Sequence, residues 1–122
     1  MTDVEKMSFE FALKIVKSFG VFKKHVDIAL ARQLLRSGTS IGANVHEAQA
    51  GQSRADFISK MAIASKEARE TEYWLKLFDQ AGFLASIPDG SVLLSDSRSL
   101  VNILTKIVKT TQKKEVKSNV GC

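Results

Sequence analysis

Apolar residues recur every three or four positions along most of the chain, which is the spacing that places side chains on one face of an α-helix. The first such row, in residues 3–19, consists of Val4, Met7, Phe11, Ile15 and Phe19. Lysines occupy the other faces of this segment, so the row predicts an amphipathic helix. Gly20 is expected to end this helix. The short connection through Phe22, Lys23 and Lys24 is then expected to return the chain antiparallel to it.

A second helix is expected from Asp27, a good N-cap residue, to Ala50. Its apolar row consists of Ala31, Leu34 or Leu35, Gly38, Ile41, Val45 and Ala48. Residues 37–42 are poor helix formers, and each glycine among them costs about 1 kcal/mol relative to alanine. Because the apolar row continues through this segment, we expect the helix to continue, with small residues that allow close approach of a neighbouring backbone. A kink between Gly38 and Gly42 is the alternative.

Gly51 and Ser53 mark a turn into a third helix, which is expected to end near Ala81. Its main apolar row alternates four- and three-residue steps and consists of Phe57, Met61, Ala64, Ala68, Thr71, Leu75 and Phe78. This is the a/d pattern of a coiled-coil seam. A second apolar row beside it consists of Ile58, Ala62, Trp74, Leu77 and Ala81. A helix that is apolar on two sides buries both, so we expect one side to face the bundle and the other a neighbouring subunit.

The connection to the fourth helix contains a turn signature, IPDG, at residues 87–90. The helix itself is expected to begin at Ser95 or Ser97. Its seam consists of Leu100, Leu104, Ile107 and Thr111. Four helices with short connections predict an all-α protein, an antiparallel up-down-up-down four-helix bundle over residues 1–116. A flexible C-terminal tail is expected at residues 117–122.

Composition narrows the partners that this bundle could have. The 122 residues carry a formal net charge of +5, which permits contact with nucleic acid or an anionic surface and requires neither. The single cysteine, Cys122, excludes a disulfide within the chain and fits a reducing cytoplasm. The N-terminal segment lacks the apolar core of a signal peptide, and no segment approaches the roughly 18 apolar residues of a membrane span. We therefore expect a cytoplasmic protein with no membrane contact.

The sequence contains no arrangement of residues that predicts catalysis, a metal or a cofactor. Di-metal helical bundles use Glu-x-x-His pairs, and neither His25 nor His46 lies three residues after a glutamate. The serines near Gly38 have no GxSxG context, and residues 38–42 lack the Gly-Lys-Ser/Thr ending of a phosphate-binding loop. We therefore expect no catalytic residues, no metal site and no cofactor.

A line of polar residues lies on one face of the second helix, and exposure to solvent alone does not explain it. It follows four-, four- and three-residue steps and consists of Arg36, Ser40, Asn44 and Glu47. Glu67 and Glu70 of the third helix could face it. We favour a hydrogen-bonded structural network that fixes helix register, because an unpaired buried charge is costly. A contact with a ligand or with another subunit is the alternative.

The clearest basic feature is a lysine stripe on the last helix. Its members recur at three- and four-residue steps, with one lysine adjacent, and are Lys106, Lys109, Lys113, Lys114 and Lys117. Lys14 and Lys17 begin a second basic group near the end of the first helix. A solvated helix face is the default interpretation of such lysines. The sharper hypothesis is contact with phosphates, and lysine without interleaved aromatic residues favours binding of the nucleic-acid backbone over reading of bases.

The two central helices resemble a known family. The resemblance rests on RSGTSIGANV at residues 36–45, on Glu47-Ala48, on SRADF at residues 53–57, and on the pattern AxxEAxETxYWL at residues 64–75. These residues are similar to the bacterial four-helix-bundle proteins named after the 23S rRNA intervening sequence. The chain departs from the pattern at Gly42, where many members have proline, and at Ala48, where many have glycine.

The resemblance implies a small non-enzymatic bundle that forms homopentamers. A related branch, the accessory proteins of diversity-generating retroelements, implies nucleic acid and a reverse transcriptase as further partners. By resemblance the family motif includes the polar line and Arg54, and it brings no catalytic role. The leading hypothesis is therefore a pentameric bundle that binds RNA or DNA through lysine surfaces. A protein-interaction scaffold with no nucleic-acid role is the alternative.

Overall fold

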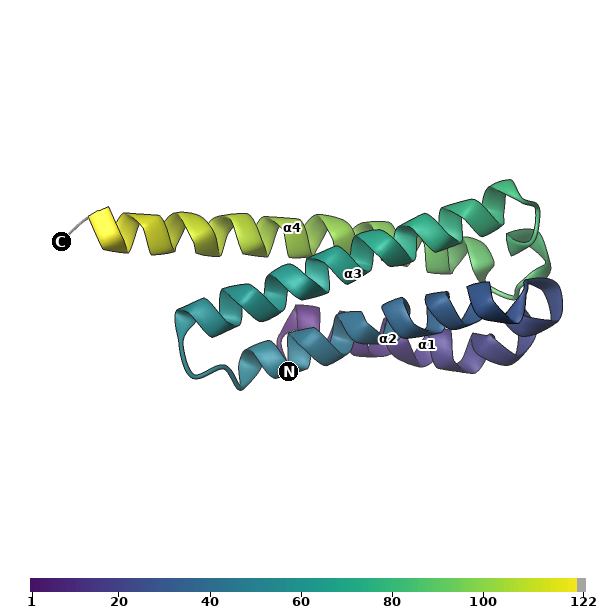
Figure 1. Ribbon diagram of the computed structural model, residues 1–122, viewed down its shortest axis with the longest axis horizontal. Helices are drawn as coiled ribbons and strands as arrows, with labels where there is room; N and C mark the ends of the chain where they lie inside the picture. Colours follow the sequence, from purple (N-terminus) through teal and green to yellow (C-terminus); the bar gives the residue numbers. More distant parts are fainter. Residues whose placement is uncertain (121–122) are drawn as a thin grey trace.

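Over residues 1–120 the chain folds into four long α-helices and one short 3-10 helix, in the computed structural model shown in Figure 1. The structure describes the backbone of residues 1–120 and the side chains of residues 1–114. The helices are α1 (Asp3–His25), α2 (Ile28–Gln49), α3 (Arg54–Gln80), η1 (Leu84–Ser86) and α4 (Gly90–Val120). Successive helices run antiparallel, and each packs along the one before it. The predicted all-α, up-down-up-down four-helix bundle is thus confirmed.

The first helix is longer than its sequence pattern indicated. Gly20 does not end α1, which continues for another turn and a half to His25. The physical reason is burial: Phe22 and Val26, just beyond the glycine, are both almost fully buried in the core. The connection to α2 is then only two residues long, and the Asp27 carboxylate accepts a hydrogen bond from the backbone N–H of Ala29 at 2.9 Å, as an N-cap should.

The second helix passes through the run of small residues without a break, as the apolar periodicity predicted. A Cβ placed on Gly42 would lie 3.1 Å from the backbone oxygen of Ser8, and one placed on Gly38 would lie 3.0 Å from Cγ1 of Ile15. These distances show that α1 lies directly against the glycines of α2. The absence of side chains there allows the two helices to approach closely. The end of α2 and the Ser53 N-cap of α3 also lie where the sequence placed them.

A glycine with positive φ ends the third helix. Gly82 has φ +86°, its N–H donates to the carbonyl of Asp79, and the N–H of Phe83 donates to the carbonyl of Phe78. This is the Schellman arrangement, which satisfies carbonyls that the helix end would otherwise leave unpaired.

The fourth helix begins earlier than predicted, at Gly90 rather than at Ser95 or Ser97. The first turns are needed to bury Leu93 and Leu94. Ser97, far from capping the helix, is fully buried inside it and donates a hydrogen bond to the carbonyl of Leu94 at 2.7 Å.

The hydrophobic core follows the predicted seams. Along α3 the seam from Met61 to Phe78 is buried, and on α4 Leu100 and Leu104 have no exposed surface. The second apolar row of α3 is less buried than the seam. Ile58, Ala62 and Trp74 are only half-buried, and Leu77 and Ala81 are exposed. The bundle therefore covers one of the two apolar sides and leaves the other partly open.

The C-terminal end of α4 projects beyond the turn between α2 and α3 (Figure 1). The helix continues to Val120, past the boundary expected at residue 116. Cys122 lies outside the described residues. The flexible tail at 117–122 stays a prediction.

Candidate functional site

The α2–α3 polar cluster, which we define as Arg36, Glu67, Glu70 and Trp74, joins the two central helices. The Arg36 guanidinium donates from Nη1 to Glu67 Oε2 at 3.1 Å and from Nη2 to Glu70 Oε2. Glu70 Oε2 also accepts a hydrogen bond from the Trp74 indole N–H at 3.0 Å. The Glu67 side chain is 12% exposed and that of Arg36 47% exposed, so the cluster lies at the edge of the interface. One arginine thus spans two carboxylates one helical turn apart.

The structure brings together only part of the predicted polar line. Ser40 donates to the carbonyl of Arg36 at 2.7 Å, and the amide of Asn44 donates to the carbonyl of Ser40 at 2.8 Å. Both therefore satisfy the backbone of their own helix and do not reach α3. Glu47 is exposed and forms no ion pair among the side chains of residues 1–114. Within residues 1–114, Arg36 is the member of the line that contacts α3, whereas we expected the four residues to belong to one hydrogen-bonded network.

A second polar contact between α2 and α3 lies deeper and was missed from the sequence. The hydroxyls of Ser37 and Thr71 lie 3.0 Å apart, and neither residue has exposed surface. Thr71 also approaches the carbonyl of Glu67 at 2.8 Å. The available signal was that Thr71 interrupts an otherwise apolar seam, since a buried hydroxyl requires a partner. The pair fixes the register of α2 against α3.

The lysines divide into paired and unpaired members. Lys14 forms an ion pair with Asp96 across α1 and α4, at 2.9 Å, so its charge is partly balanced within the protein. Lys17 is exposed. On α4, the exposed lysines without an ion pair in residues 1–114 are Lys106, Lys109, Lys113 and Lys114. The side chain of Lys117 lies outside the described residues.

We call Lys106, Lys109 and Lys113 the α4 lysine row. They follow steps of three and four residues, so they share one face of the helix. A shallow hollow of about 700 Å³ lies beside the first two, and it is lined by Ser99, Asn102, Ile103, Thr105, Lys106 and Lys109. Hydroxyl, amide and ammonium groups can all donate hydrogen bonds to an anion. The row therefore combines positive charge that has no ion pair within residues 1–114 with neutral donors along one helix.

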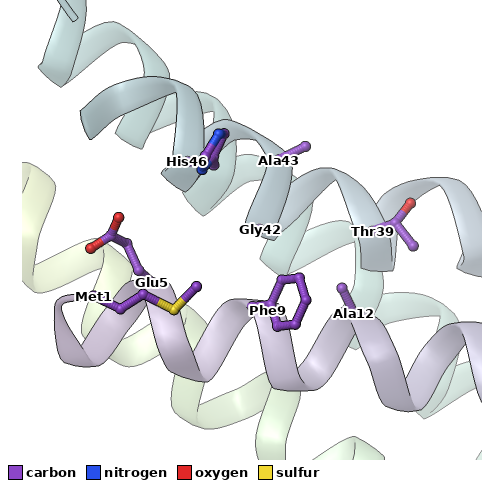
Figure 2. Close-up of a pocket in the computed structure, with 8 residues that line it drawn as sticks. All are labelled: Met1, Glu5, Phe9, Ala12, Thr39, Gly42, Ala43 and His46. Atoms are coloured by element: carbon purple, nitrogen blue, oxygen red, sulfur yellow. The ribbon is translucent and has the colours of Figure 1, made fainter. Parts of the chain in front are cut away.

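A groove between α1 and α2 is a second concave feature of interest, with a volume of about 380 Å³ (Figure 2). Glu5, Phe9 and Ala12 line it from α1, Met1 from the segment before α1, and Thr39, Gly42, Ala43 and His46 from α2. Most of its surface is apolar.

Glu5, at one end of this groove, helps to cap the N-terminus of α1. Its carboxylate accepts a hydrogen bond from the backbone N–H of Thr2 at 2.6 Å, and the Thr2 hydroxyl accepts one from the N–H of Glu5. The hydrogen bond from the Thr2 backbone holds the pKa of Glu5 below its usual value of 4.5. This reciprocal capping box uses Glu5 to start α1.

Among the described residues, no three His, Cys, Asp or Glu side chains come together as metal ligands would. No described helix is both long and apolar enough to span a membrane.

These features define a class: small antiparallel helical bundles whose central helices are joined by polar contacts and whose last helix carries basic residues. The chain belongs to the 23S rRNA-intervening sequence protein family, whose model matches residues 2–106. The predicted resemblance is confirmed. The family match ends within the α4 lysine row, at Lys106.

A solved structure supports the assignment. It is a crystal structure at 1.70 Å of a protein of unknown function of the S23 ribosomal protein family from Bacteroides thetaiotaomicron. The two chains are 42% identical, with a TM-score of 0.76, over 87% of this chain and 98% of that chain. Comparison with curated proteins returns no significant match. Neither the family description nor that of the similar structure names a catalytic activity.

Proposed function

We propose that this protein is a non-enzymatic, homo-oligomeric bundle of the cytoplasm that binds the phosphate backbone of RNA or DNA through the α4 lysine row. The observation that carries the proposal is the contrast between lysines. Lys14 forms an ion pair with Asp96, whereas Lys106, Lys109 and Lys113 lie on one exposed helix face and have no ion pair with any side chain of residues 1–114.

The spacing of the row suits a polyanion. From Asn102 to Lys113 the helix rises about 16 Å, at 1.5 Å per residue, so donors recur along a line and not around a point. Asn102 and Thr105 add neutral donors of the kind that contact phosphate and sugar, whereas the Ser99 hydroxyl donates to the carbonyl of Ser95. Contacts of this kind position a nucleic acid without reading its bases, so we expect weak dependence on sequence and strong dependence on salt.

The test is a titration of fluorescently labelled structured RNA and duplex DNA, followed by anisotropy at several salt concentrations. We expect the triple change of Lys106, Lys109 and Lys113 to glutamine to weaken binding at low salt by at least about tenfold. The slope of log affinity against log salt should fall by about 3, or about one per lost phosphate contact. The matched control replaces Lys60, Lys66 and Lys76 of α3 with glutamine, which removes the same charge. Equal losses in both triples, or no loss in either, contradict the proposal.

The homo-oligomeric half of the proposal is supported by exposed apolar surface. Phe9, Val16, Tyr73 and Leu77 are each more than 40% exposed on helices of the bundle. A closed ring of five copies is the number that the family resemblance implies. Light scattering that gives a monomer at micromolar concentration contradicts this half alone.

The same exposed surface favours a second function, a scaffold that binds other proteins and has no nucleic-acid role. A pull-down distinguishes the two: partners that survive nuclease treatment and the lysine triple favour the scaffold. A reverse transcriptase as such a partner stays a prediction.

A further inference from the structure

The groove between α1 and α2 is large enough to hold one small molecule (Figure 2). Its volume of about 380 Å³ lies within the range of about 300–1,000 Å³ that is typical of ligand pockets. Between Glu5 and Ala12, α1 rises about 10 Å along the groove, at 1.5 Å per residue. The titratable side chains of the lining, Glu5 and His46, lie at one end. At the other end, the Thr39 hydroxyl donates to the carbonyl of its own helix at Leu35, at 2.7 Å. The groove is therefore apolar along its length and polar at one end.

An exposed aromatic ring forms one wall of the groove. Phe9 is 58% exposed, and its ring lies on the side of α1 that faces α2 (Figure 2). On the α2 side, Gly42 and Ala43 line the middle of the groove, and their small size leaves space beside the ring. A flat apolar group in that space would remove both its own surface and the Phe9 ring from water, and a second aromatic ring would add a favourable contact between the rings. The walls thus favour an aromatic ligand.

The polar end of the groove holds a carboxylate with a free oxygen. Glu5 Oε2 accepts a hydrogen bond from the Thr2 N–H at 2.6 Å, whereas Oε1 accepts none from residues 1–114. The hydrogen bonds with Thr2, and then the charges of the terminal ammonium and His46, lower the pKa of Glu5, so its carboxylate is ionised at neutral pH. His46 forms no hydrogen bond within residues 1–114, and a neutral imidazole has one nitrogen that accepts one. This end of the groove can therefore accept hydrogen bonds from a ligand.

The charges around this end favour a cation. The acids of α1 and α2 on or beside the lining residues are Asp3, Glu5, Glu10 and Glu47, and the cations beside them are Lys6 and the terminal ammonium. Four negative charges against two positive ones leave an excess of two negative charges, on a chain whose net charge is +5. A carboxylate ligand or a phosphate would be repelled by this excess, and an ammonium would be attracted.

We propose that the groove between α1 and α2 binds a small aromatic amine, with its ring against Phe9 and its ammonium at Glu5 and His46. An ammonium donates three hydrogen bonds, enough for Glu5 Oε1, the imidazole and one water molecule. The site goes beyond the proposed function, because it uses no lysine of α4 and takes a ligand of the opposite charge. It lies within one protomer and is therefore compatible with a ring of five copies.

The test is methyl NMR of the full-length protein labelled at alanine, at a concentration at which it is assembled. The probe is 2-phenylethylamine, and 2-phenylethanol and 3-phenylpropanoic acid present the same ring with a neutral or a negative end. We expect the amine to shift the methyl signals of Ala12 and Ala43 saturably, in the low millimolar range of a probe with about nine non-hydrogen atoms, and to leave Ala85 of η1 unchanged. The alcohol should bind at least about threefold more weakly than the amine, and the acid more weakly still.

Two variants check where the probe binds. Glu5→Gln removes the charge and keeps the start of α1, because glutamine also serves at this position of a capping box. It is expected to bind the amine as weakly as the wild type binds the alcohol. Asp79→Asn, the same change on an exposed site of α3, is the matched control and should bind the amine like the wild type. Ala43→Phe places a ring in the groove and should abolish the shift of Ala12. Circular dichroism checks that each variant is folded.

Three outcomes overturn the proposal. The first is an alcohol or acid that binds as tightly as the amine, since charge then has no part in the binding. The second is a Glu5→Gln variant with the wild-type affinity for the amine. The third is the absence of a shift at Ala12 and Ala43, which is the result if a neighbouring subunit covers Phe9. The lysine row lies outside the groove, so each of these outcomes leaves the proposed nucleic-acid binding intact.

Discussion

Gly42→Ala tests whether the close approach of α1 and α2 depends on the missing side chain. Alanine is the better helix former by about 1 kcal/mol, so helix propensity alone predicts a more stable protein. The structure predicts the opposite sign. The new Cβ would lie 3.1 Å from the carbonyl oxygen of Ser8 and 3.3 Å from its carbonyl carbon. Both are backbone atoms, which cannot rotate out of the way as a side chain can.

The magnitude follows from two opposing terms. To restore ordinary contact, α1 must move away from α2 by a few tenths of an ångström, which loosens packing around buried residues such as Ile15 and Ile41. Overpacking of this kind typically costs about 1–3 kcal/mol. After the gain in propensity, we expect a net loss of about 1 kcal/mol. For 122 residues that lowers the melting temperature by about 4 °C.

The assay is urea and thermal unfolding, followed by far-UV circular dichroism and by the fluorescence of Trp74, the single tryptophan. The matched control is Gly20→Ala, where the new Cβ meets nothing within 4 Å and should add up to about 1 kcal/mol. Both variants are measured beside the wild type at the same protein concentration. If Gly42→Ala is as stabilising as Gly20→Ala, the close approach does not limit the residue at this position and the reasoning is wrong.

Three further predictions concern the polar contacts. Thr71→Val is expected to cost about 1 kcal/mol in urea unfolding, because it removes one member of a buried hydroxyl pair, and the loss should be smaller when Ser37→Ala is already present. Arg36→Met is expected to cost about 1 kcal/mol, a figure reduced for the exposure of the arginine, since the mostly buried Glu67 keeps a carboxylate with no cation beside it. The lowered pKa of Glu5 predicts that wild type exceeds Glu5→Gln in stability above pH 4.5, and that the difference vanishes as pH falls through the lower pKa of the folded state; an equal difference at all pH values would contradict this.

The apolar periodicity predicted the fold because the apolar side chains must be buried, and helices with one apolar face can bury them by packing together. The seam of α3 and the continuous α2 were both legible in the sequence, since three- and four-residue steps leave few other ways to bury those side chains. The ends of the helices were harder to predict from the sequence. Gly20 and Ser95 have the residue types that commonly stop or start a helix. However, Phe22 follows Gly20 and Leu93 precedes Ser95, and both side chains are buried in the core, so the helices extend to include them. Tertiary burial outweighed the local preference at both sites.

The polar line shows a different limit. Sequence spacing places Arg36, Ser40 and Asn44 on one face, and it cannot say whether a side chain reaches the next helix or turns back to its own. Serine and asparagine are short enough to bond the carbonyl four residues earlier, and both do so here. Arginine is long enough to cross to Glu67. Side-chain length, and not position on the face, decided which residues joined the cluster.

The distribution of packing among the helices has a consequence for how quickly the protein folds. Neighbours in sequence pack along their lengths, whereas α1 and α4 meet over a smaller interface, with Lys14 and Asp96 as an ion pair across it. Most contacts therefore join segments that are close together in the chain, and the entropy of closing a long loop enters late. Helical hairpins can form one after another, each adding to the one before. We expect single-exponential refolding on the microsecond to millisecond scale that is typical of helical bundles with local contacts.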